Sequence, residues 1–146
     1  IRGSGDQQFI SDNGFYASPG MIRRTGDFAQ GIDDTIFLLT HGAGRTGSPG
    51  PATIYSGEDV GDNETTQMMR DAGIRFAVVG NIHEAAGIAT TLDGTPVPER
   101  EFVDEFVLNA GTLQDWRLLD GRTINGSAAI ITVDGNQAKY EMIYLE

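Results

Sequence analysis

The chain has 146 residues, with 21 acidic and 10 basic side chains and a formal net charge of −11 at pH 7. This length favours a single domain, residues 1–146, that is large enough to bury a core of its own. The lack of cysteine excludes disulfides, thiolate catalysis and every cysteine-ligated metal site. The acidic balance, without a Lys or Arg cluster, argues against nucleic acid and anionic membranes as partners.

No apolar run reaches the about 18–20 residues that a membrane-spanning helix needs, so the sequence predicts a soluble chain without membrane insertion. Composition does not define the compartment, and the cytoplasm is only the location that it favours among the alternatives. The chain begins with Ile1 rather than Met, which indicates a processed, trimmed or partial product. Residues 1–34 are polar and rich in turn-forming residues, so irregular structure with one or two short strands is expected there.

Residues 35–87 carry the pattern of a strand–loop–helix–strand unit. An unbroken apolar run over residues 35–40 predicts a strand that is covered on both faces. A loop rich in glycine and proline follows, and the pair Asp62-Asn63 is suited to cap a short helix that stops at Gly73. A second buried strand is expected over residues 75–79. Strands joined through such a helix are parallel, so their carboxyl ends meet at one edge of the sheet.

Residues 88–146 are predicted to be rich in β-structure. The dipeptides Asp93-Gly94 and Asp134-Gly135 are typical of turns between two strands, and a further strand is expected to end at Asn109. The predicted fold class is therefore α/β, with one parallel βαβ unit followed by a mainly antiparallel β region.

Both histidines of the chain, His41 and His83, follow predicted buried strands. The βαβ unit places His41 and the stretch 81–83 at the same edge of the sheet. Imidazole is a common metal ligand, and a ligand at the end of a strand is held by a rigid scaffold. The alternative is that they are two unrelated loop histidines that cap or solvate turns.

Three motifs occur in a definite order after predicted strands: Thr40-His41, Gly80-Asn81-Ile82-His83 and Asn109-Ala110-Gly111-Thr112. They resemble the C-terminal half of the calcineurin-like metallophosphoesterase family, in which successive strands end in Thr-His, Gly-His-x-His and Asn-Pro-Gly-Ser. The resemblance covers about residues 35–145. It implies that the fold is half of a metallophosphoesterase-like β-sandwich.

The resemblance also implies metal-ligand roles for three residues. His41 and Asn81 correspond to ligands of the second metal and His83 to a ligand of the first, and the cation would be Mn, Zn or Fe. Asn81 stands where the family has histidine, and an amide oxygen is a poorer ligand than imidazole for these metals. The family's carboxylate motifs, which its N-terminal half supplies, do not occur here, and two-metal hydrolysis needs a bridging carboxylate. We therefore expect weak or no metal binding, no catalytic residue and no hydrolysis from this chain alone.

Two functions from different classes follow from these observations. One is the C-terminal part of a metallophosphoesterase-like protein, active in phosphoester hydrolysis only if an N-terminal half of the same protein or another protein chain completes the site. The other is a non-catalytic structural or assembly subunit that retains the scaffold. Half a sandwich exposes apolar sheet surface, so both hypotheses predict a partner chain or a homo-oligomer.

A competing motif lies in the loop that follows the first predicted strand. Residues 42–47 match the G-x-G-x-x-G pattern of dinucleotide-binding folds, which requires a helix to begin within the motif. Pro49 and Pro51 oppose such a helix. No nucleotide cofactor is therefore expected.

Overall fold

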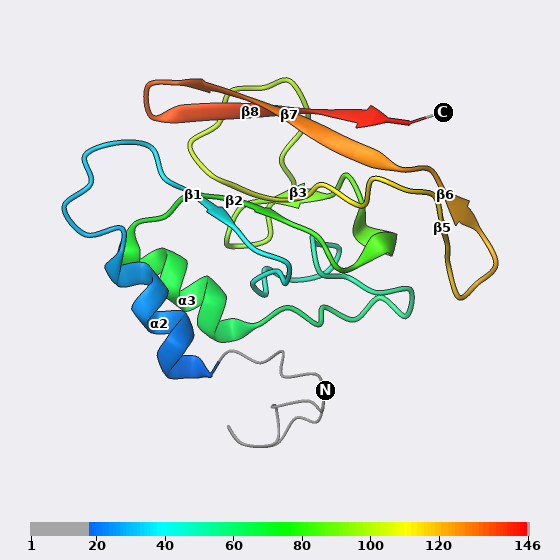
Figure 1. Cartoon of the computed structure of the whole chain (residues 1–146), viewed down its shortest axis with the longest axis horizontal. Helices are drawn as coiled ribbons and strands as arrows, with labels where there is room; N and C mark the ends of the chain where they lie inside the picture. The colour runs from blue at the N-terminus through cyan, green and yellow to red at the C-terminus, as the bar shows by residue number, and fades with distance from the viewer. Residues whose placement is uncertain (1–17, 146) are drawn as a thin grey trace.

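The computed structural model describes residues 18–145, and the expectations for residues 1–17 lie outside this range. The described part of the chain is α/β and forms three layers (Figure 1). Two helices cover one face of a four-stranded mixed sheet, and a long β-hairpin covers the other face. No helix among these residues is long and apolar enough to cross a membrane.

The elements follow in chain order as α2 (Pro19–Asp27), β1 (Phe37–Leu39), α3 (Asn63–Ala72), β2 (Phe76–Val79), the 3-10 turn η1 (His83–Ala85), β3 (Ala89–Thr90), β4 (Phe106–Asn109), β5 (Trp116–Arg117), β6 (Thr123–Ile124), β7 (Ser127–Asp134) and β8 (Gln137–Tyr144). The mixed sheet has the order β1-β2-β4-β3. Strands β1, β2 and β4 run parallel, whereas β3 is antiparallel to β4. The parallel βαβ unit predicted from the sequence is thus present, with α3 between β1 and β2.

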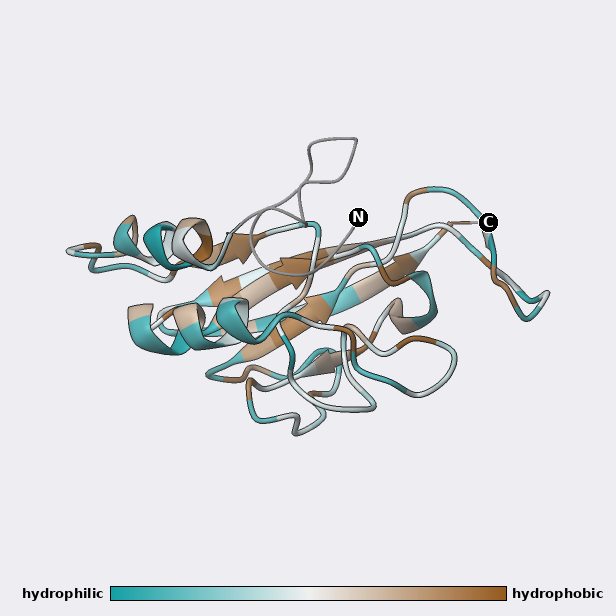
Figure 2. Ribbon diagram, turned by 90° about the horizontal axis from the view of Figure 1, so that it is seen from below, coloured by the Kyte–Doolittle hydropathy of each residue, from teal (hydrophilic) through white to brown (hydrophobic). Residues whose placement is uncertain are grey.

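The side chains of β2 and β4 point alternately to the two faces of the mixed sheet, so the core forms two clusters, one on each face. Ala77 and Val107 join the cluster beneath the helices, where they meet Met68 and Met69 of α3. Phe76 and Phe106 point to the opposite face, with ring centroids 5.0 Å apart, and pack against the β7–β8 hairpin. The strands of the mixed sheet are mostly apolar, whereas the helices mix polar and apolar residues (Figure 2). Burial on both faces explains why these strands lack the polar–apolar alternation of a half-exposed sheet.

The boundaries of α3 follow from its capping residues. Asp62 is the N-cap, and its carboxylate accepts hydrogen bonds from the backbone N–H groups of Glu64 and Thr65. Gly73 ends the helix in the left-handed conformation, with φ of 68°, which glycine adopts without a steric penalty. Both ends agree with the sequence-based prediction, because each is encoded within one turn of the helix.

The prediction for residues 1–34 is wrong over α2, where irregular structure or short strands were expected. The N-cap hydroxyl of Ser18 accepts a hydrogen bond from the backbone N–H of Met21, and Pro19 follows in the first turn. Gly26 is buried against α3, since a Cβ at this position would lie 3.1 Å from Cγ of Met68. The helix is held by this close contact between helices rather than by a broad apolar face, so hydrophobic periodicity did not reveal it.

The prediction that the first strand is covered on both faces is correct for only part of β1, because Phe37 and Leu38 pack against the two core clusters whereas Leu39 does not. Strand β1 lies at the edge of the mixed sheet, and the side chain of Leu39 is 74% exposed. Phe37 does pack inward, stacked on Phe76 with a centroid distance of 5.1 Å. An apolar run shows that a strand is extended, but it does not show whether neighbouring elements cover the whole strand.

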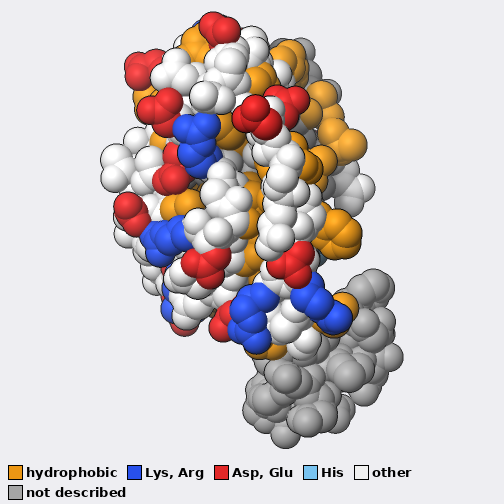
Figure 3. All heavy atoms as spheres, turned by 90° about the vertical axis from the view of Figure 1, so that its left-hand side faces the viewer, with side chains coloured by type: hydrophobic (Ala, Val, Ile, Leu, Met, Phe, Trp, Pro, Cys, Tyr) orange, Lys and Arg blue, Asp and Glu red, His pale blue; other side chains and the backbone are white. Residues whose placement is uncertain are grey.

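The face at the helix end of the molecule mixes basic and acidic side chains (Figure 3). Arg23 of α2 pairs with Glu64 of α3 at 2.8 Å, and Arg70 pairs with Asp93 of the turn after β3. These pairs are largely exposed, and such pairs contribute little to stability. On the face that Figure 3 shows, basic residues do not gather into one patch.

Candidate functional site

The carboxyl edge of the parallel strands brings together the segments that carry the candidate metal ligands. His41 follows β1 by two positions, and Gly80 follows β2 directly. The backbone N–H of Gly80 donates a hydrogen bond of 3.1 Å to the carbonyl oxygen of His41. Just before this bond along the two strands, the backbone N–H of Thr40 donates to the carbonyl oxygen of Val78 at 3.2 Å. The two segments therefore leave the sheet side by side, and His41 is exposed there.

Asn81 lies in a tight turn immediately after β2. The backbone N–H of Ile82 donates to the carbonyl oxygen of Gly80 at 2.8 Å, which closes the turn around Asn81. Asn81 has φ of 69°, a left-handed conformation that asparagine tolerates better than most residues. Its side chain is exposed. The turn itself thus gives a backbone reason for asparagine at this position, separate from any role in metal binding.

His83 begins the 3-10 turn η1, and its ring lies against an aromatic residue from a distant part of the chain. The imidazole centroid is 4.1 Å from the ring centroid of Trp116 on β5, with the two planes at 70°. His83 is half-buried, and the Trp116 residue is 42% exposed. The position of Trp116 at this edge could not be predicted from the sequence, because no spacing or motif links the β5–β6 hairpin to η1.

Asn109 anchors the edge from beneath and was not among the predicted site residues. It is the last residue of β4 and is fully buried. Its side-chain N–H group donates to the carbonyl oxygens of Pro51 and Ile82, both at 2.8 Å. Its side-chain oxygen accepts from the backbone N–H of Gly111 at 2.9 Å. One amide thereby joins the loops that follow β1, β2 and β4. Its signals in the sequence were its place at the end of an apolar strand and at the start of the motif Asn109-Ala110-Gly111-Thr112.

A second anchor orders the long loop between β1 and α3. One carboxylate oxygen of Asp59 accepts from the backbone N–H groups of Thr46 and Gly47, at 3.1 and 2.6 Å. The other oxygen accepts from Gly61 N–H at 2.7 Å. The hydroxyl of Thr90 donates to the buried hydroxyl of Thr46 at 2.9 Å, which fixes the loop to β3. This loop contains the G-x-G-x-x-G match, and no helix begins within that match.

The donors at the carboxyl edge do not make a metal centre by themselves. Across residues 18–145, no group of three or more His, Asp or Glu side chains is arranged to hold a metal ion. Catalytic zinc sites use three protein ligands and keep one open position, and two-metal sites add a bridging carboxylate. Two imidazoles and one exposed amide fall short of both donor sets. Further ligands would have to come from outside the described residues.

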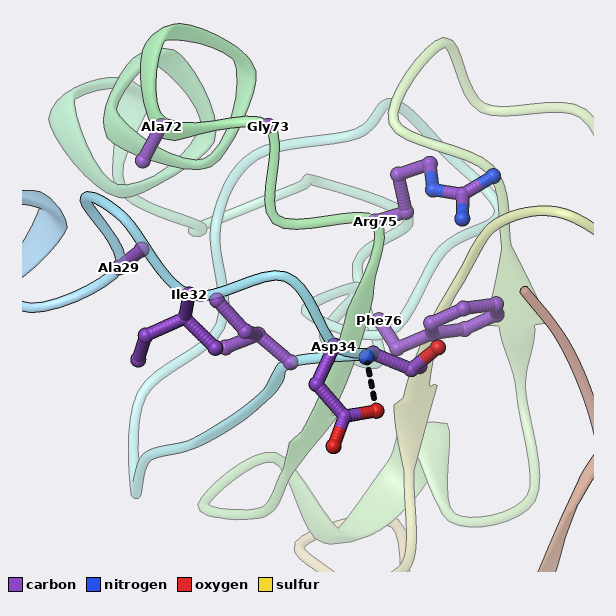
Figure 4. Close-up of a pocket in the computed structure, with 9 residues that line it drawn as sticks. Ala29, Ile32, Asp34, Ala72, Gly73, Arg75 and Phe76 are labelled. Atoms are coloured by element: carbon purple, nitrogen blue, oxygen red, sulfur yellow. Dashed lines mark hydrogen bonds between the residues drawn. The ribbon is translucent and has the colours of Figure 1, made fainter. Parts of the chain in front are cut away.

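A small cavity lies at the opposite end of the parallel strands. It has a volume of about 100 Å³ and is lined partly by Asp34, Ala72, Arg75 and Phe76 (Figure 4). Arg75 turns away from Asp34, and its guanidinium donates to the carbonyl oxygen of Asn136 at 3.0 Å. The cavity is bounded by residues that precede β1 and β2 and by the first residue of β2, so it is remote from the edge that carries the histidines.

Comparison of the chain with protein-family models, with curated proteins and with solved structures finds no match. The likeness to metallophosphoesterases therefore rests on the order of three short motifs. The fold places these motifs at the carboxyl ends of β1, β2 and β4, which are neighbouring parallel strands.

Proposed function

We propose that this chain is the C-terminal part of a metallophosphoesterase-like protein. Phosphoester hydrolysis would require an N-terminal half or a partner chain to complete the metal site. The observation that carries the proposal is the hydrogen bond between Gly80 N–H and the carbonyl oxygen of His41. It aligns the segment that bears His41 with the segment that bears Asn81 and His83, at one edge of a parallel sheet.

The scaffold beneath this edge supports the same interpretation. Metal sites need ligands on elements whose positions are fixed by packing and by hydrogen bonds. Asn109 supplies such support, because it is buried and bonded to three loops at once. The mixed sheet facing the β7–β8 hairpin is also compatible with one half of a β-sandwich.

The ligands that this chain lacks define what the N-terminal half or the partner chain must contribute. Two cations must be held about 3.5–4 Å apart, and a bridging carboxylate is needed to activate the attacking water. His41, His83 and the weaker ligand Asn81 provide no carboxylate. The proposal therefore assigns the carboxylates to the N-terminal half or partner, and this chain alone should bind Mn²⁺, Zn²⁺ or Fe²⁺ weakly and hydrolyse nothing.

A non-catalytic structural or assembly subunit is the second candidate function. The contact between Trp116 and His83 favours it, because the indole occupies space next to a candidate ligand. The left-handed turn at Asn81 also favours it, because this residue has a local structural role. In this case the edge would retain its architecture without binding metal.

Metal titration by calorimetry and a phosphodiesterase assay separate the two candidates. We expect weak binding of Zn²⁺ or Mn²⁺ to the wild-type chain and its loss in both His41→Ala and His83→Ala. Thr123→Ala, an exposed change on β6, is the control. No turnover of a generic phosphodiester is expected until an N-terminal fragment or partner is added. Zero metal binding by the wild type would favour the structural subunit. Hydrolysis by the chain alone that disappears in His83→Ala would contradict the predicted need for another part.

A further inference from the structure

Within residues 18–145, the outer edge of β7 is open beyond the first residue of the strand. Among the described residues, β7 is hydrogen-bonded within a sheet only to β8, and the register pairs Asp134 with Gln137 across a two-residue turn. In such a hairpin, every second residue directs its backbone N–H and C=O groups to the partner strand. The residues between them direct these groups to the opposite, outer edge. The backbone N–H and C=O groups of Ala129, Ile131 and Val133 therefore face the open edge.

Neighbouring contacts agree with this assignment. Ser127 lies two positions before Ala129, so its backbone groups also face the outer edge of β7. Its N–H donates to the carbonyl oxygen of Thr112 rather than to β8. This contact covers only the first residue of the strand. From Ala129 onward, the edge meets no backbone partner within residues 18–145.

The far edge of β8, in contrast, is covered by the segment that precedes β4. Val103 and Ala138 exchange backbone hydrogen bonds of 3.0 Å, and Arg100 N–H donates to the carbonyl oxygen of Tyr140. The carboxylate of Glu99 accepts from the backbone N–H of Met142 at 2.9 Å. The hairpin thus has one protected edge and one open edge, and the open edge belongs to β7.

The side chains of β7 do not protect its open edge. Proteins usually block long edge strands with charge, proline, a bulge or a covering loop. The eight residues Ser127–Asp134 contain no proline, and their only charge is at the last position. Their pairing with β8 has no bulge. Ile130 is 54% exposed and Val133 is 48% exposed.

We propose that a second copy of this chain pairs antiparallel along β7, with a two-fold axis at Ile131. In this register Ile131 lies opposite Ile131 of the second copy, and Ala129 lies opposite Val133 of the second copy. All three residues direct their backbone groups to the interface, so each opposed pair can exchange two hydrogen bonds. The two hairpins then form one continuous sheet with the order β8-β7-β7-β8.

The strand is chemically complementary to itself in this register. On the outer face, Ile130 lies opposite Thr132 of the second copy, and Ala128 lies opposite Asp134. The two Asp134 carboxylates are at opposite ends of the interface, so no like charges face each other across it. A two-fold interface of this kind is closed, and it leaves no further copy of the β7 edge open.

The net charge of −11 per chain opposes association, which gives the interface a characteristic salt dependence. Repulsion between two strongly acidic chains is screened when the ionic strength rises. Backbone hydrogen bonds and apolar contacts along β7 change little with salt. Dimerisation should therefore be tighter in about 0.5 M salt than in about 0.05 M salt.

Sedimentation equilibrium on the full 146-residue chain tests the proposal. We expect a monomer–dimer equilibrium between about 1 μM and 1 mM. Ile130→Lys should raise the Kd at least about tenfold, because it places two ammonium groups beside the two-fold axis. Ile143→Lys is the matched control, since Ile143 lies on β8, faces outward and is 41% exposed. It should leave the Kd within about twofold, because β7 separates it from the second copy.

Amide hydrogen exchange locates the interface independently of these variants. The amides of Ala129, Ile131 and Val133 should exchange more slowly as protein concentration rises. A monomer at every concentration would overturn the proposal and leave the edge to a strand of another chain. A dimer that is lost in Leu39→Lys but retained in Ile130→Lys would overturn it in favour of the edge of β1.

Discussion

The side-chain nitrogen Nδ2 of Asn109 lies 2.8 Å from the carbonyl oxygen of Pro51, 58 positions earlier in the chain. This bond crosses from the end of β4 to the middle of the long loop after β1. The same nitrogen bonds to the carbonyl oxygen of Ile82, so a single side chain determines how the loops of the carboxyl edge sit together.

Removal of this amide should therefore destabilise the protein and loosen the edge. Asn109→Ala leaves the carbonyl groups of Pro51 and Ile82 without their donor, and we expect a loss of about 2–4 kcal/mol. Chemical denaturation measures the change. Asn125→Ala, at an exposed position, is the control and should shift stability by less than about 0.5 kcal/mol. An equal effect in both variants would contradict the anchoring role.

Substitutions at Asn81 separate its backbone role from its proposed ligand role. Asn81→Gly should preserve stability, whereas Asn81→Ala should cost about 1 kcal/mol, because φ is 69°. Asn81→His should tighten Zn²⁺ or Mn²⁺ binding by about tenfold, since imidazole is a better ligand than an amide oxygen. Calorimetric titration measures the affinity, with His41→Ala in the same background to remove the neighbouring ligand. A lowered melting temperature without a gain in affinity would favour the structural subunit.

The pH dependence of stability should report on Tyr140. Burial raises the pKa of its hydroxyl to about 12 from a usual value of 10.0, and the charges of Glu99 and Tyr144 add to the shift. The unfolded state therefore loses this proton first, so the contribution of Tyr140 is present below pH 10 and is lost as pH rises through about 12.

Tyr140→Phe provides the comparison for this effect. At about pH 8 the variant should be less stable by about 1 kcal/mol, because the hydrogen bond from the hydroxyl to the carbonyl oxygen of Val97 is lost. The difference should shrink as pH rises from about 10 to 12, since only the wild type carries this hydroxyl. Urea denaturation across this range measures it. A constant difference would contradict the raised pKa.

The loop between β1 and α3 should depend on Asp59. Asp59→Ala removes the acceptor for three backbone N–H groups, so the amides of Thr46, Gly47 and Gly61 should exchange about tenfold faster. Asp59→Asn, with one carbonyl oxygen in place of two carboxylate oxygens, should give a smaller increase. Glu58→Ala changes an exposed neighbour and should leave the exchange rates unaltered.

Features encoded within a few residues could be predicted from the sequence. The cap at Asp62, the stop at Gly73, the end of β4 at Asn109 and the parallel pairing of β1 with β2 all follow from short patterns. Each depends on local hydrogen bonding or on a connection rule, so one sequence is enough to infer it.

Features that depend on distant contacts could not be predicted. Helix α2 is held by the approach of Gly26 to α3, and Leu39 is exposed because β1 lacks a neighbour on one side within the described chain. In the candidate site, too, one feature could be predicted from the sequence and another could not. The sequence predicts that His41 and His83 share an edge, but it contains no signal for the contact of Trp116 with His83.

Trp116 is the single tryptophan of the chain, so all indole emission comes from one ring that touches His83. The protein thus carries an optical reporter at the carboxyl edge without labelling. A cation or a partner chain that displaces the imidazole would change the intensity or wavelength of that emission. Events at this edge can therefore be followed in real time, and events on the helical face or along β7 can be distinguished from them by an unchanged spectrum.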